Sequence, residues 1–250
     1  MTAAVHELPD LSQLATLGKT DRIAALRRSM RKVEGRDDGS LAGSEHHSDG
    51  GGSERYIAVP AELQVLFDGG LARGAVSSID SAGAVVVALI AEATKASLQV
   101  AVVGTAQCGM LSVVEQGGDI SRVVVVEDPG EEPLEVVGLL ADGADLVVVD
   151  LPQAPPPSLA RPIMARLRKS GCALLFVGKG WPGASVRISS ELVAVHGLGR
   201  GHGRIRGIEY HVSAEGSGRP RRQVQWVVGE SGGAVGASRG AEILEFKRAQ

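Results

Sequence analysis

From Tyr56 to about Val228, short runs of β-branched residues alternate with segments long enough to form helices. The runs at 122–126 and 146–149 are almost continuously apolar, which is typical of strands covered on both faces. This alternation predicts an α/β fold with a mostly parallel, twisted sheet and right-handed crossovers. After about residue 183 the helical segments stop, which predicts an antiparallel C-terminal extension of the same sheet.

The individual elements predicted from this alternation have the lengths that are usual for strands and helices. The predicted strands are 75–79, 99–103, 122–126, 146–150, 173–177, 185–189, 192–196, 207–212 and 223–228. The predicted helices of this region are 61–67, 83–95, 109–117, 133–141 and 158–170.

Composition along the chain predicts four parts: an N-terminal arm at 1–34, a flexible linker at 35–55, the α/β core at 56–230 and a flexible tail at 231–250. In segment 20–34 of the arm, apolar residues recur every three or four positions, which predicts a basic amphipathic helix before the core. The linker and the start of the tail are rich in Gly and Ser, which is typical of flexible connections.

The arm and the tail each carry a small apolar cluster outside the core. One interpretation is a solvated helix packed on its own domain, together with a frayed C-terminus. The other is a pair of short segments that dock on a partner protein. In that interpretation the candidate partner-binding residues are Ile23, Leu26, Met30, Ile243, Leu244 and Phe246.

The chain has 26 Lys and Arg residues against 29 Asp and Glu residues, so contact with nucleic acid would need a local basic patch. Residues 178–228 supply one, with eight cationic side chains against three acidic ones. The candidate DNA contacts are Arg204, Arg206, Arg219, Arg221 and Arg222. The alternative interpretation is a solvated arginine surface, and an aromatic content of 3% leaves few rings on which bases could stack.

Cysteine content and hydropathy argue against several classes of protein. The two cysteines, Cys108 and Cys172, lack metal-binding spacing, so neither a metal site nor a disulfide framework is expected. The N-terminus carries acidic residues without the apolar stretch of a signal peptide, and no apolar run reaches the roughly 18 residues of a membrane helix. We therefore expect a cytoplasmic protein that does not bind membranes.

The strand, loop and helix at 75–95 stand where an α/β nucleotide-binding protein has its phosphate loop. Such a loop needs glycine-rich backbone, a Lys for the phosphate charge and a Ser or Thr for magnesium. Here Ala84 and Val85 stand at the Lys and hydroxyl positions, and Asp80 adds a negative charge. The degenerate nucleotide site consists of Ser81, Ala82, Gly83, Ala84, Val85 and Asp150, the last residue of a predicted strand.

We therefore expect no enzymatic activity and no bound nucleotide or other cofactor, because a triphosphate is held poorly without a cation. The alternative is an ATPase with an atypical loop, which would need Lys95 or Lys179 to supply that charge.

Several short segments, in their order and spacing, resemble the core of RecA over roughly residues 20–228. The segment from Leu66 to Gly74, LFDGGLARG, resembles the entry to the strand that precedes the phosphate loop of RecA. The stretch 118–124 resembles the approach to its third core strand, and 145–150 occupies the place of its magnesium-binding acid. Residues 184–187 resemble the start of its late β-strands.

A RecA-like core with a degenerate nucleotide site and short loops after Asp150 and Val177 resembles the ImuA family. That resemblance implies a non-enzymatic accessory factor for translesion synthesis and mutagenesis induced by DNA damage, in the SOS mutasome. It implies two partners: ImuB, an inactive relative of Y-family polymerases, and an error-prone C-family polymerase. It also implies that the helix at 20–34 contacts ImuB, RecA or a second copy of this chain, and that the protein joins the nucleoid after damage.

Two other functions stay open at this point. One is a RecA-like DNA-binding module without ATPase activity, which the basic region 178–228 would serve through phosphate contacts. The other is a SulA-like inhibitor of cell division, a name given to proteins similar to this family.

Overall fold

The computed structural model describes residues 55–81, 83–104, 109–199, 202–216 and 220–229. All described residues belong to one compact unit of the chain, within 49–250. The predicted helix at 20–34 and the tail lie outside the described residues, as do all six candidate partner-binding residues. Ala82 and Arg219 lie outside them as well.

The described residues form an eight-stranded sheet in the order β10-β9-β8-β3-β7-β6-β4-β5. Its strands are β3 (Val76–Ile79), β4 (Val100–Val103), β5 (Val123–Val126), β6 (Leu146–Asp150), β7 (Ala173–Val177), β8 (Val186–Gly199), β9 (His202–Gly216) and β10 (Arg222–Gly229). Strands β3 to β8 pair in parallel, whereas β9 pairs antiparallel with both β8 and β10. The predicted α/β fold with its antiparallel extension is confirmed, and it is compatible with a RecA-like core.

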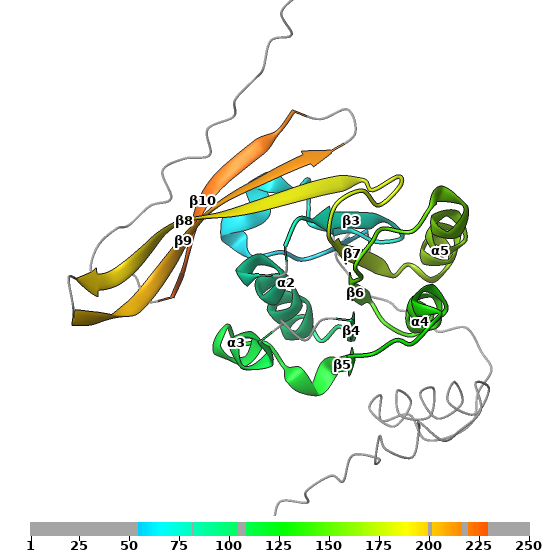
Figure 1. Ribbon diagram of the computed structural model, residues 1–250, viewed down its shortest axis with the longest axis horizontal. Coiled ribbons are helices and arrows are strands. Elements are labelled where there is room, and N and C mark those ends of the chain that lie inside the picture. Colours follow the sequence, from blue (N-terminus) through cyan, green and yellow to red (C-terminus); the bar gives the residue numbers. More distant parts are fainter. Residues whose placement is uncertain (1–54, 82, 105–108, 200–201, 217–219, 230–250) are drawn as a thin grey trace, which may run out of the picture. The chain divides into compact units, whose positions relative to one another are not determined.

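Helices cover both faces of the parallel part of the sheet. Figure 1 shows α2 (Ala84–Lys95) and α3 (Met110–Glu115) on one side, and α4 (Pro133–Leu140) and α5 (Pro157–Ser170) on the other. Such double coverage explains why β4 and β6 are apolar at almost every position. Among the described helices, none is long and apolar enough to cross a membrane.

Helix α2 is the centre of the core, since nine of its twelve residues are buried. Its first turn contains Val85, Val86 and Val87, which are weak helix formers, so the stability of the helix depends on packing. Burying a valine or leucine side chain contributes about 1.5–3 kcal/mol. The same apolar cluster includes Ile188 of β8 and Trp226 of β10, so the antiparallel extension shares its core with α2.

Three features differ from the sequence prediction. The strands expected at 185–189 and 192–196 are one strand, β8, because register shifts after Leu192 and His196 keep its pairing with β9 unbroken. The helix expected at 61–67 is the 3-10 helix η2 (Ala61–Leu66). A further 3-10 helix, η3 (Ile120–Arg122), and a two-stranded sheet of β1 (Tyr56–Ile57) and β2 (Leu71–Ala72) were too short to predict.

Candidate functional site

The loop between β3 and α2 holds the degenerate nucleotide site, and its described residues have other roles. Ser81 is exposed, and Gly83 caps α2 by accepting a hydrogen bond from the Val87 N–H at 3.2 Å. Ala84 is half-buried and packs against the core, and Val85 is a buried core residue with 1% exposure. The position of the magnesium-binding hydroxyl is therefore occupied by a core side chain.

Asp80 follows β3 directly and ties this strand to β8. Its Oδ2 accepts a hydrogen bond from the Ser189 hydroxyl at 2.6 Å, and its Oδ1 accepts one from the Ser190 N–H at 3.1 Å. Its own N–H donates to the Ile188 carbonyl at 3.2 Å. The charge of Asp80 is evident from the sequence, but this structural role is not, because Ser189 lies 109 residues further along the chain.

Asp150 ends β6 at the same edge of the sheet, but β7 separates β6 from β3. Partial burial raises the pKa of the Asp150 carboxyl above its ordinary value. Gly104, which follows β4, lies against the backbone of Asp150, since a Cβ on Gly104 would stand 2.1 Å from the Asp150 carbonyl oxygen. Within the described residues, no group of three His, Cys, Asp or Glu side chains could hold a metal ion.

The loop after β7 is fixed by a buried tryptophan. Trp181 is 1% exposed and packs on Phe176 with ring centroids 5.2 Å apart. A Cβ on Gly183 would lie 3.0 Å from Met164 Cε, so the loop also lies close to α5. Trp181 therefore anchors the segment that carries Lys179, a feature that the sequence analysis did not identify.

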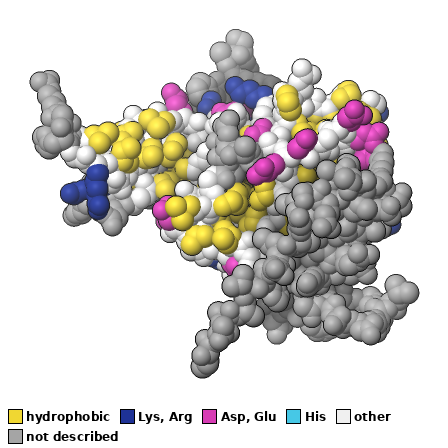
Figure 2. Space-filling model, turned by 60° about the horizontal axis from the view of Figure 1, so that its bottom comes forward, with side chains coloured by type: hydrophobic (Ala, Val, Ile, Leu, Met, Phe, Trp, Pro, Cys, Tyr) yellow, Lys and Arg dark blue, Asp and Glu magenta, His cyan; other side chains and the backbone are white. Residues whose placement is uncertain are grey.

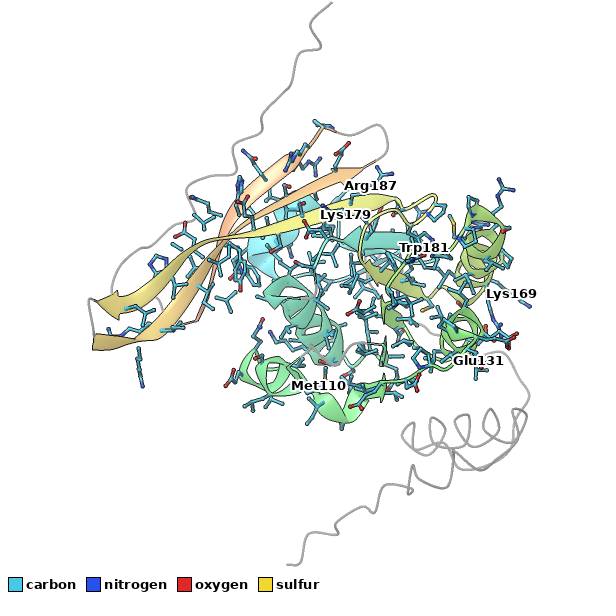
Figure 3. The ribbon with its side chains drawn as sticks, in the orientation of Figure 1. Met110, Glu131, Lys169, Lys179, Trp181 and Arg187 are labelled. Atoms are coloured by element: carbon cyan, nitrogen blue, oxygen red, sulfur yellow. The ribbon has the colours of Figure 1, made fainter. Side chains whose placement is uncertain are left out.

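A pocket of about 270 Å³ lies beside this loop, at the carboxyl end of β3, and we call it the β3 pocket. Its polar lining includes Ser78, Asp80, Lys179, Arg187, Ser213 and Arg221. Figure 3 shows Lys179, from the loop after β7, close to Arg187 of β8. Carboxyl ends of parallel strands are the usual place for ligands in open α/β sheets.

The four candidate DNA contacts that the structure describes do not form one patch. Arg221 lines the β3 pocket, where its Nη2 donates to the Ser213 hydroxyl at 2.9 Å. Arg222, the next residue in the chain, is paired instead with Asp68 at 2.6 Å. Arg204 and Arg206 are exposed on the outer part of β9. Arg219 lies outside the described residues.

The outer part of the β8–β9 hairpin carries apolar side chains on one sheet face. Leu192 pairs with Tyr210, and Val195 pairs with Ile208, so these four side chains continue the face on which Trp226 is buried. Leu192 is 54% exposed and Val195 is 38% exposed. Figure 2 shows hydrophobic side chains gathered on this hairpin. We call these four residues the outer hairpin surface.

The sequence of this chain is similar to one protein-family model and to one mycobacterial protein. The family model described as MT3502 N-terminal domain matches residues 64–183. The Mycobacterium tuberculosis protein Rv3395c is 35% identical over 175 residues, which cover 66% of this chain and 86% of that protein. This chain belongs to the same family as Rv3395c. The MT3502 model covers the loop before α2, Asp150 and Trp181, whereas Arg187, Arg221 and the outer hairpin surface lie C-terminal to it.

Proposed function

We propose that this relative of Rv3395c is an ImuA-like, non-enzymatic accessory factor for translesion synthesis and mutagenesis induced by DNA damage. It acts in the SOS mutasome by contacting ImuB and an error-prone C-family polymerase, and RecA is a further candidate partner. The RecA-like order of its sequence segments supports this proposal, together with an α/β sheet that is compatible with a RecA-like core.

The observation that carries the proposal is that residues of the loop between β3 and α2 stabilise the fold and do not form a phosphate site. Phosphoryl-transfer proteins place a Lys and a magnesium-binding hydroxyl there. Here Asp80 is bonded to Ser189 and Ser190 of β8, and Val85 is part of the core. A carboxylate that holds the sheet together has replaced the phosphate-binding chemistry, which favours a pseudo-ATPase that works through contacts with other proteins.

The outer hairpin surface supports a role in protein contacts. Exposed apolar residues that lie together on one face are typical of protein–protein interfaces. Leu192 and Val195 are exposed and lie on a strand that is paired with β9, so a partner would meet a preformed surface. The two arms at 1–34 and 231–250 stay predictions, as additional docking segments.

A pull-down with the full chain against ImuB, the C-family polymerase and RecA tests this function. We expect ImuB to be retained, and the Leu192→Ser and Val195→Ser double variant to retain less of it. Leu159→Ser is the matched control, because Leu159 on α5 is 53% exposed, as Leu192 is 54% exposed. Deletions of 1–34 and 231–250 test the arms. Retention of none of the three proteins by the intact chain would contradict the proposal.

A further inference from the structure

The β3 pocket is built on the sheet face opposite to the one that packs on α2. Arg187 pairs with Glu215, and Ser189 pairs with Ser213, so these four side chains share one face of β8 and β9. The alternate residues Ile188 and Val212 are buried in the core. The pocket therefore lies on a different side of the sheet from α2, although Asp80 contributes to its edge.

Ser78 is the most informative residue of the pocket. It is 4% exposed, yet it lines the pocket, and its hydroxyl makes no hydrogen bond to any described residue. Because this hydroxyl faces the pocket and is not sealed from solvent, it is free to donate a hydrogen bond to a molecule bound there. Arg187 lies next to it in register on β8, so an acceptor bound beside Ser78 would also meet a guanidinium.

The charges around Ser78 indicate that the pocket favours an anionic acceptor. Lys179, Arg187 and Arg221 line the pocket, whereas its carboxylates belong to Asp80 and Glu215. Asp80 is already occupied by hydrogen bonds from Ser189 and Ser190. Within the described part of the chain, neither Lys179 nor Arg187 has an ion-pair partner. The lining thus holds three cations against two carboxylates, and this excess of positive charge favours a bound anion.

We propose that the β3 pocket binds a phosphate group, with Lys179, Arg187 and Arg221 around its oxygens and the Ser78 hydroxyl as a further donor. Planar guanidinium groups match the geometry of phosphate oxygens, and lysine adds a compact charge. Pockets for whole drug-sized ligands span about 300–1,000 Å³. The volume of about 270 Å³ therefore suits a phosphate group together with part of the molecule that bears it. The phosphate belongs to a free nucleotide or to a nucleic-acid backbone.

The β3 pocket is formed by residues other than those of the degenerate nucleotide site. Phosphate binding there does not depend on the proposed assembly role. Trp181 holds the loop that carries Lys179, and Arg221 is held over the sheet by its hydrogen bond to Ser213, so the cations are partly preorganised. Preorganisation lowers the entropy that binding a ligand would otherwise cost.

The test uses the full chain with three probes: inorganic phosphate, ATP without magnesium, and a fluorescein-labelled 20-nucleotide oligo(dT). Thermal unfolding follows the first two probes, and fluorescence anisotropy between about 50 and 200 mM salt follows the third. The test variant is Lys179→Ala with Arg187→Ala. The matched control is Lys169→Ala with Arg161→Ala, which removes equal charge from exposed positions of α5.

We expect at least one probe to bind the intact chain and the α5 control. The pocket variant should bind that probe about tenfold more weakly. For oligo(dT), the slope of log affinity against log salt concentration should become shallower by about one for each cation removed. Binding of phosphate or ATP identifies a free phosphate ligand, whereas binding of oligo(dT) alone identifies a nucleic-acid backbone. Ser78→Ala should weaken binding of the same probe while leaving the protein folded.

Two results would overturn the proposal. One is no binding of any of the three probes at 50 mM salt by the intact chain. The other is equal loss of binding in the pocket variant and in the α5 control, which would indicate a response to total charge only. Circular dichroism of all variants excludes unfolding as the cause of a loss.

Discussion

Asp80 accepts a hydrogen bond from the Ser189 hydroxyl at 2.6 Å, although the two residues are 109 positions apart. The bond joins the end of the first parallel strand of the core to β8, where the antiparallel extension begins. In a nucleotide-binding protein this end of the strand leads into the phosphate loop. Here the same place in the sheet holds two parts of the fold together.

Removal of the Asp80 carboxylate should destabilise the protein. Asp80→Ala leaves the Ser189 hydroxyl and the Ser190 N–H without their acceptor, and hydrogen bonds to charged groups contribute about 1.5–3 kcal/mol. Urea unfolding of Asp80→Ala, Ser189→Ala and the double variant should give a coupling free energy of about 1 kcal/mol. Glu215→Ala, the other carboxylate of the pocket, serves as the control. Additive effects of Asp80→Ala and Ser189→Ala would contradict this role.

Magnesium and ATP together should not stabilise the protein through the loop before α2. A ligand at 100 times its dissociation constant raises the free energy of unfolding by about 2.7 kcal/mol. Ala84→Lys returns a lysine to the loop, but Val85 stays in the core and Asp80 keeps its charge. We therefore expect Mg²⁺ and ATP to shift the melting temperature of Ala84→Lys no more than that of the unaltered chain, in which any shift comes from the β3 pocket. Thermal unfolding with Mg²⁺ and ATP measures this. A shift that Ala84→Lys increases would show that the loop still binds nucleotide.

Cys172 should be unreactive in the folded protein. Burial, followed by the nearby Asp145 charge, raises the pKa of its thiol from 9.0 to about 12. In a Cys108→Ser variant, which leaves Cys172 as the single thiol, a disulfide reagent at pH 8 should react only after urea is added. Rapid reaction without urea would mean that the thiol is accessible in the folded state.

The same shift predicts a loss of stability at high pH. The unfolded thiol ionises from about pH 9, whereas the folded thiol keeps its proton to about pH 12. The neutral thiol therefore contributes fully below pH 9, and its contribution falls by up to about 1.4 kcal/mol per pH unit above that. Urea unfolding between pH 8 and pH 11 should show a smaller decline for Cys172→Ala. Equal declines in both proteins would contradict the shift.

Gly104 should not accept a side chain. Its φ is +81°, and a Cβ would stand 2.1 Å from the Asp150 carbonyl oxygen, so Gly104→Ala should cost well over about 1 kcal/mol. Gly83→Ala is the comparison, because a Cβ there meets no described atom within 4 Å. We expect Gly83→Ala to change the free energy of unfolding by about 1 kcal/mol or less. Equal losses for both variants in urea would contradict this difference.

The parallel part of the sheet was predictable because its strands are covered on both faces. A run such as 146–150 keeps its apolar residues at almost every position, and the structure places β6 at the same bounds. The antiparallel extension was predictable in type but not in its boundaries. Bulges in β8 interrupt the alternation of side chains without ending the strand, so the pattern around Leu192 suggested two strands instead of one.

Most of the pocket and the bonds of Asp80 could not be predicted, because their partners are distant in sequence. Lys179, Arg187 and Arg221 come from three segments, and their arrangement depends on the order of the strands. Arg222, next to Arg221, points instead to Asp68, 154 residues earlier in the chain. Local charge therefore indicated a basic region but could not separate the two arginines, which alternate between the faces of the sheet.

The outer hairpin surface should affect partner binding without affecting stability. Leu192→Ser and Val195→Ser replace exposed side chains, so the free energy of unfolding should change by only about 0.5 kcal/mol for each substitution. Binding to ImuB should weaken, whereas Leu159→Ser should bind as the unaltered chain does. If these substitutions also lower the free energy of unfolding in urea by clearly more than this, the residues stabilise the fold, and weaker binding could not be attributed to a partner surface.

Size-exclusion chromatography of the full chain mixed with ImuB, with and without magnesium and ATP, tests the central claim most directly. We predict one complex whose amount does not depend on nucleotide, because the loop from Asp80 to Val85 serves the fold and the core. Separate elution of the two proteins, or a complex that forms only with nucleotide, would contradict a non-enzymatic assembly factor.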